Sequence, residues 1–132
     1  YELIPTTPGV DDYLRLRIAA GLSAKTREQA EIGLPNSWYG VTVVHDGAAI
    51  GMGRIIGDGG TAFQIVDIAL DPSHQGKGLG KQIMAALMAR LKAEAPEGAY
   101  VSLIADGDAR HLHAKYGFEP VMPASIGMAR LL

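Results

Sequence analysis

Apolar positions recur with a helical period in one long segment of the chain. From Lys81 to Ala95 they fall on a stripe that repeats about every 3.6 residues, and Pro96 and Gly98 follow the segment. The stripe consists of Ile83, Met84, Leu87, Met88 and Leu91. This pattern predicts an amphipathic helix that buries the stripe and ends near residue 95.

Two neighbouring segments have the composition of paired β-strands. Trp38 to Val44 and Ala48 to Ile56 are rich in apolar and β-branched residues. Between them lies Asp46-Gly47, a dipeptide that suits a two-residue hairpin turn because both residues readily adopt positive φ. We therefore expect an antiparallel hairpin here.

Two further segments resemble strands that are covered on both faces. Phe63 to Leu70 is apolar except for Gln64 and Asp67, and Tyr100 to Ala105 is also mostly apolar. Near-continuous apolar runs of this length are typical of central strands in sheets that helices cover on both sides.

The first third of the chain carries two helix signals. Thr7-Pro8 offers a capping hydroxyl and a proline at the first helical position, and the apolar stripe that follows ends at Gly21. Ser23 is predicted to cap a second helix that reaches Ile32 and has little apolar face. We expect this second helix to be weakly buried and mobile.

The last part of the chain completes the predicted order of elements. Ala109 to Tyr116 reads as a short helix, and Phe118 to Met122 and Ile126 to Leu132 read as final strands. A first strand is expected near Glu2 to Ile4. The fold class is therefore α/β (mixed α+β), with a mixed antiparallel and parallel sheet flanked by helices, in a single domain over residues 1–132.

Composition removes several classes of function. Twelve Lys and Arg against fourteen Asp and Glu give a net charge of −2, so we expect no nucleic acid and no membrane as partner. The chain has no cysteine, which excludes thiolate chemistry and disulfides. His45 and His74 lack the spacing of a metal site, so no metal is expected. The apolar runs are too short to span a membrane, and we expect a soluble cytoplasmic protein.

A glycine-rich turn precedes the long helix. The segment Gln75-Gly76-Lys77-Gly78-Leu79-Gly80 aims backbone N–H groups and a positive helix end at one point, which favours an anion. The dinucleotide pattern G-x-G-x-x-G fails because residue 81 is Lys81. The P-loop pattern fails because Lys77 is followed by Gly78.

Two motifs in this order resemble the GNAT superfamily of N-acetyltransferases. In that family a strand ends in an L-x-V-type segment and a proline, followed by Q/R-x-x-G-x-G/A. Ile68-Ala69-Leu70, Pro72 and the segment from Gln75 to Gly80 match this pattern. The segment from Ala109 to Pro120 is similar to the family's A-x-x-x-Y-x-K-x-G-F-E-P motif.

The resemblance implies a place for acetyl-coenzyme A between the fourth and fifth strands, which diverge in this family. Its pantetheine would bond to the backbone of the segment Ile68-Ala69-Leu70, and its pyrophosphate would bind amides in the loop. The loop residues concerned are Gln75, Gly76, Lys77, Gly78, Leu79, Gly80 and Lys81. The resemblance further implies cofactor contacts from Asp106, Ala109, Leu112 and His113.

The chain departs from the family pattern at the catalytic positions. Where relatives carry a tyrosine that protonates the departing thiolate, this sequence has His113, so either His113 or water supplies the proton. Where some relatives carry a base glutamate, it has Gln64. Asp67 is a candidate base, with a buried structural carboxylate as the alternative. The backbone N–H near Ile68 is expected to polarise the thioester carbonyl.

The acceptor side is expected to lie near Arg54, Asp58 and the segment from Leu22 to Tyr39. Trp38 and Tyr39 could form apolar walls there, and ordinary core packing is the alternative.

The resemblance implies an N-acetyltransferase that moves an acetyl group from acetyl-coenzyme A directly to a primary amine, on a small molecule or a protein. The alternative is a non-catalytic coenzyme A-binding module that has lost the tyrosine acid. A homodimer stays open as an assembly.

Overall fold

A computed structural model describes residues 1–107 and 109–132. Its elements are β1 (Glu2–Ile4), α1 (Val10–Ala19), α2 (Arg27–Gly33), β2 (Tyr39–His45), β3 (Ala48–Gly57), β4 (Ala62–Leu70), α3 (Leu79–Glu94), β5 (Tyr100–Leu103) and α4 (Ala109–Ala114). Two short 3-10 turns, η1 (Leu34–Asn36) and η2 (Pro72–His74), follow α2 and β4.

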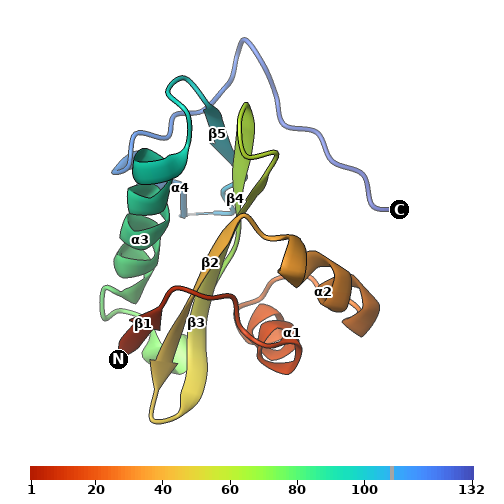
Figure 1. Cartoon of the computed structure of the whole chain (residues 1–132), viewed down its shortest axis with the longest axis vertical. Coiled ribbons are helices and arrows are strands. Elements are labelled where there is room, and N and C mark those ends of the chain that lie inside the picture. The colour runs from red at the N-terminus through yellow and green to blue at the C-terminus, as the bar shows by residue number, and fades with distance from the viewer. Residues whose placement is uncertain (108) are drawn as a thin grey trace.

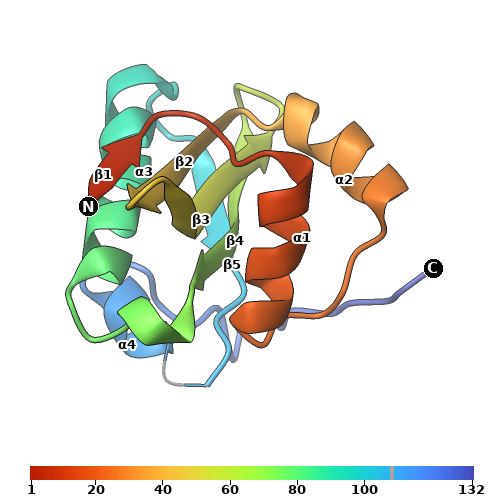
Figure 2. The same ribbon diagram turned by 90° about the horizontal axis from the view of Figure 1, so that it is seen from below.

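The strands form one mixed sheet in the order β1-β2-β3-β4-β5. All neighbouring strands run antiparallel except β4 and β5, which pair in parallel. Helix α3 covers one face of the sheet, and α1 and α2 cover the other (Figures 1 and 2). This arrangement confirms the expected mixed fold with helices on both faces.

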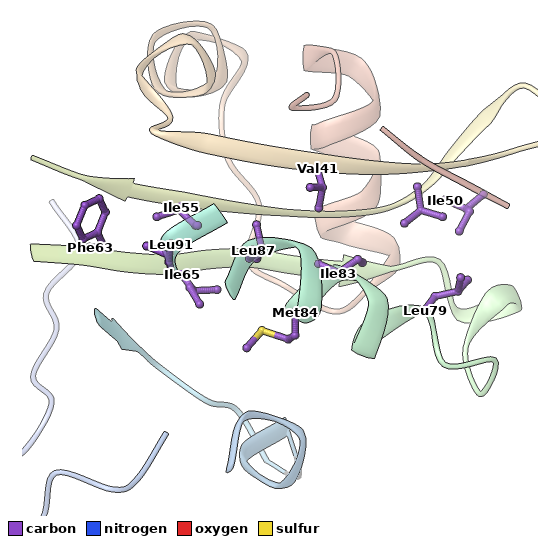
Figure 3. Packing of buried hydrophobic residues seen from close by; sticks show 11 residues of the cluster. Val41, Ile50, Ile55, Phe63, Ile65, Leu79, Ile83, Met84, Leu87 and Leu91 are labelled. Atoms are coloured by element: carbon purple, nitrogen blue, oxygen red, sulfur yellow. The ribbon is translucent and has the colours of Figure 1, made fainter. Parts of the chain in front are cut away.

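The main hydrophobic core lies between α3 and the sheet. Ile83, Met84 and Leu87 are fully buried and face the strands, as Figure 3 shows. Helix and sheet approach closely at Gly53, where an added Cβ would lie 2.6 Å from Ile83 Cγ2. The helical stripe predicted from the sequence is therefore the face that packs on the sheet.

The hairpin turn adopts the conformation expected of its residues. Asp46 has φ 49° and Gly47 has φ 78°, so both take positive φ between β2 and β3. The hairpin prediction is confirmed, and its strands run from Tyr39 to His45 and from Ala48 to Gly57.

The starts of three helices differ from their predicted positions. Helix α1 begins at Val10 with Gly9 as its N-cap, so the predicted cap at Thr7 is wrong. Helix α2 is capped by Thr26, whose hydroxyl accepts a hydrogen bond from the backbone N–H of Gln29 in a capping box. Ser23 is therefore not the cap. Helix α3 already begins at Leu79, so the end of the glycine-rich segment belongs to its first turn.

The two strands predicted at the C-terminal end are wrong. Residues 118–132 contain neither a strand nor a helix: Phe118 still packs against the main core, a turn follows at residues 122–124, and the end of the chain runs away from the body of the protein (Figure 1). A strand is stable only when its backbone groups pair with a neighbour, and this segment pairs with no strand in the described part of the chain.

Candidate active site between β4 and β5

Strands β4 and β5 separate and leave a cleft between them. Their parallel pairing ends at Ile65 and Leu103, and β4 continues to Leu70 while β5 stops. A cleft of about 560 Å³ opens at this point, and its lining includes Ile65, Ile68 and Leu103. Further walls come from α1, the segment after it, and α4. The cleft therefore lies where the family resemblance places the pantetheine of coenzyme A.

A β-bulge distorts β4 at the edge of the cleft. Met52 pairs with Ala69 and Arg54 pairs with Val66, so Gly53 alone lies opposite both Asp67 and Ile68. Asp67 has φ 56°, which is uncommon for a residue with a side chain. The bulge interrupts the regular ladder and turns the Asp67 side chain toward α1.

Asp67 is the centre of a buried polar network. Its Oδ2 accepts a hydrogen bond of 2.9 Å from the Tyr13 hydroxyl and one of 2.7 Å from Arg54 Nε. Its Oδ1 pairs with Arg17 Nη1. Burial and the adjacent carboxylate raise the pKa of Tyr13. A role as proton acceptor would require one of these donors to leave Asp67, so the geometry favours a structural carboxylate.

His113 lies in the cleft wall on α4 and is almost completely buried. Its side chain lines the cleft, and its ring is 6.5 Å from the ring of Phe118, measured between centroids. Nδ1 is buried and has no hydrogen-bond partner among the described residues. Burial lowers the pKa of His113 below its ordinary value of 6.5, because the imidazolium loses hydration. The ring is therefore mainly neutral at pH 7.

The glycine-rich turn stands next to the cleft at the start of α3. Gly76 and Gly78 both have φ 79°, and an added Cβ on either would meet open space. Glycine is favoured here because the backbone is left-handed. In the first helical turn, a Cβ on Gly80 would lie 3.5 Å from Leu112, which lines the cleft. The turn and the cleft thus adjoin each other through Leu112.

Six of the predicted site residues come together at the cleft. Asp67, Ile68, Asp106, Ala109, Leu112 and His113 all line it.

Ala69 does not line the cleft, because its side chain packs in a second buried cluster beneath α1. Leu70 is partly buried against the main core, with its Cδ2 2.7 Å from the position of a Cβ added to Gly51. Gln75 Nε2 donates to the Leu70 carbonyl at 3.5 Å, while Lys77 Nζ lies 5.6 Å from the centre of the Tyr1 ring. The Lys81 carbonyl accepts a bond of 3.0 Å from the Tyr116 hydroxyl.

The residues expected to form an acceptor wall occupy different places. Trp38 packs against Phe63, with 4.7 Å between ring centres, and Tyr39 lies under Arg90. Trp38 and Tyr39 therefore pack against other side chains of the protein, which was the alternative to their forming an acceptor wall. Asp58, in the loop between β3 and β4, accepts hydrogen bonds from the Thr61 hydroxyl and from the backbone N–H groups of residues 60, 61 and 62, and these bonds lower its pKa. Of the residues expected near the acceptor, Arg54 lines the cleft, as do Leu22 and Lys25 from the segment Leu22 to Tyr39, and Tyr13 and Arg17 lie beside them.

The sequence did not indicate Tyr13 or Arg17 as site residues. Tyr13 belongs to the apolar stripe of α1, and Arg17 has no motif around it. The available signal was Asp67, a single charge inside an apolar strand, which requires buried partners from elsewhere in the chain.

Within residues 1–107 and 109–132, no group of three or more His, Asp or Glu side chains could hold a metal ion. No helix in that part of the chain is long and apolar enough to cross a membrane.

Comparison with known proteins gives a consistent result. A model of the acetyltransferase (GNAT) family matches residues 11–118. A probable acetyltransferase of unknown function from meticillin-resistant Staphylococcus aureus has 50% sequence identity and a TM-score of 0.95, over 99% of this chain and 98% of that one. A GNAT-family acetyltransferase from Streptococcus pneumoniae has 24% identity and a TM-score of 0.77, over 99% and 97% of the two chains, which shows a shared fold. No curated protein is significantly similar to the chain.

Proposed function

Because this chain belongs to the acetyltransferase (GNAT) family, we propose that it is a cytoplasmic enzyme that transfers an acetyl group from acetyl-coenzyme A directly to a primary amine. The single observation that carries the proposal is the cleft that opens where β4 and β5 part, with the Asp67 bulge on one wall and His113 on the other. The alternative is a coenzyme A-binding module without catalysis, which the histidine at the acid position motivates.

The chain has the features that would hold the acyl donor. Beyond Ile65 the edge of β4 facing β5 has no strand partner, so its backbone can bond to an extended pantetheine chain. The N-terminus of α3 can receive the pyrophosphate, since its first N–H groups have no partner within the helix. The open space at Gly76 and Gly78 lets a phosphate approach the backbone of the turn. Bound in this way, acetyl-coenzyme A supplies the thioester carbonyl that accepts the electron pair of the amine.

Residues at the bulge prepare the reacting groups. The bulge separates Ile68 from the regular pairing with β3, and its N–H is proposed to donate to the thioester oxygen. The network of Arg17, Arg54 and Tyr13 fixes Asp67 and hence the bulge, so Asp67 is proposed to act as a positioning residue. The amine nitrogen bonds to the carbonyl carbon, the carbon–sulfur bond breaks, the amine loses a proton and the sulfur gains one.

His113 is the side chain proposed to provide the proton for the sulfur. Because burial lowers its pKa, the protonated fraction at pH 7 is below about one quarter, which is the fraction for an unshifted histidine. Water is therefore proposed to supply a growing share of this proton as the pH rises. With Asp67 engaged by three donors and Gln64 unable to accept a proton, water is also proposed to carry the proton away from the amine.

A screen of primary amines tests this function. The purified chain is incubated with acetyl-coenzyme A and a panel of amino acids, amino sugars, diamines and peptides, and products are detected by mass together with thiol release. The enzyme hypothesis predicts an acetylated product whose amount equals the thiol released. Tight binding of coenzyme A with no product over the whole panel would favour the non-catalytic module.

A further inference from the structure

The acceptor wall of the cleft carries an excess of positive charge. Arg17, Lys25 and Arg54 line this wall together with one carboxylate, Asp67. The other carboxylate of the lining, Asp106, belongs to the loop after β5, on the side where the acyl donor is proposed to bind. A positively charged concave wall attracts anionic groups and repels additional cations.

The three cationic side chains of this wall differ in how many of their N–H groups already have a hydrogen-bond partner. Arg17 is fully engaged, since Nε and Nη2 bond to the Ser23 carbonyl and hydroxyl at 2.7 and 3.0 Å, and Nη1 pairs with Asp67. Arg54 uses Nε on Asp67 and Nη1 on the Ser37 hydroxyl, at 2.7 and 3.1 Å.

Two donors of the wall are left for a ligand. Among the described residues, no group accepts a hydrogen bond from Arg54 Nη2 or from Lys25 Nζ. Arg54 is mostly buried, with 15% of its side chain exposed, so a bond to its free nitrogen is poorly screened by solvent. Lys25 lies in the segment between α1 and α2 and is half-buried.

Resting on the proposed function, we infer that the acceptor amine carries an anionic group, a carboxylate or a phosphate, which binds Arg54 Nη2 and Lys25 Nζ. Guanidinium and ammonium groups form strong charge-assisted hydrogen bonds with both anions. Arg54 pairs with Val66 next to the bulge, so an anion held there places a nearby amine close to Ile68. A plain diamine would be repelled by the same wall.

Matched pairs of amines test the inference. Tyrosine is compared with tyramine, and glucosamine 6-phosphate with glucosamine, so that each pair tests one anion on an unchanged skeleton. We expect the anionic member of at least one pair to have a kcat/KM about tenfold higher, the size of one charge-assisted bond. The pair that shows the preference identifies the anion. Equal kcat/KM within both pairs would overturn the inference.

Charge reversal at Lys25 provides the second measurement. Lys25→Glu should abolish or invert the preference, while Lys92→Glu, the same change on the exposed side of α3, should leave it unchanged. Binding of the same amines by calorimetry separates this inference from the proposed function. If no amine is acetylated but tyrosine or glucosamine 6-phosphate binds in a Lys25-dependent way, the function fails and the inference stands. A preference that survives Lys25→Glu would contradict it.

Discussion

The Tyr13 hydroxyl donates a hydrogen bond of 2.9 Å to Asp67 Oδ2, joining the first helix to the bulge of β4. Arg17, one turn further along α1, pairs with the other oxygen of the same carboxylate. Asp67 and Arg17 have side chains less than one-tenth exposed, so this junction is inside the protein. The bulge that shapes the cleft is thus held by two residues of α1 that lie 50 and 54 positions before Asp67 in the sequence.

Loss of the Asp67 charge should destabilise the protein strongly. Asp67→Asn leaves the buried Arg17 and the mostly buried Arg54 without a counter-charge, and the free energy of unfolding should fall by about 3–5 kcal/mol. Tyr13→Phe removes one hydrogen bond only and should cost about 1 kcal/mol. Urea denaturation of both variants measures these values. A smaller loss for Asp67→Asn than for Tyr13→Phe would contradict the ion network.

Local sequence signals were sufficient for the elements that depend on neighbouring residues. Asp46-Gly47 determines its own turn through backbone preference, and the stripe from Ile83 to Leu91 determines the buried face of α3. The positions of the helix starts were not determined by such signals, because Thr7, Ser23 and Thr26 all carry hydroxyls that can cap a helix. Only Thr26 has Gln29 three residues later to complete a capping box.

Features that depend on contacts between residues far apart in the chain could not be predicted from the sequence. The bulge at Asp67 shifts the phase of β4, and no property of residues 63–70 shows which way its side chain turns. Its partners Arg17 and Arg54 come from α1 and β3, so spacing along the chain carries no signal for them. The final strands failed for the same reason, since the pattern of residues 126–132 indicates a strand but not the edge that would pair with it.

A side chain at Gly78 should weaken coenzyme A binding in addition to lowering the free energy of unfolding. Gly78→Ala and Gly98→Ala both place a side chain at φ near +80° in open space, so each should cost about 1 kcal/mol of folding free energy. Only Gly78 lies in the turn before α3. In wild type, coenzyme A at about 100 times its dissociation constant should stabilise the fold by roughly 2.7 kcal/mol.

Thermal denaturation with and without coenzyme A measures the difference between the two glycine variants. The stabilisation should be largely lost in Gly78→Ala and retained in Gly98→Ala. An equal thermal shift in the two variants would remove the pyrophosphate from this turn.

Burial of His113 should make the protein less stable in acid. Its pKa is lower in the folded chain than the unfolded value near 6.5, so the unfolded chain binds more protons between these two values. The free energy of unfolding should therefore rise with pH through this window and gain nothing more from His113 above it. His113→Phe should reduce the rise, as measured by denaturation at a series of pH values. An unchanged pH dependence would show that the imidazole is hydrated.

The pH profile of acetyl transfer should report whether His113 is the acid. If protonated His113 donates to the sulfur, the single-turnover rate should fall as the pH rises above the lowered pKa of His113. Deprotonation of the acceptor amine acts in the opposite direction and raises the rate with pH. His113→Ala should be slower and lack this decline. His113→Tyr should restore transfer and extend it to higher pH, since a tyrosine phenol with a pKa near 10 stays protonated there. If His113→Ala keeps both the wild-type rate and profile, water is the proton donor.

Amide NMR during a titration with coenzyme A tests most directly whether the gap between β4 and β5 receives the acyl donor. Chemical-shift changes should concentrate on Ile68 and Leu70 in β4 and on residues 76–81 around the start of α3. Amides of β1 and β2, which lie away from the gap, should change little. Changes confined to β1 and β2, or no changes at saturating coenzyme A, would show that the gap does not bind the acyl donor.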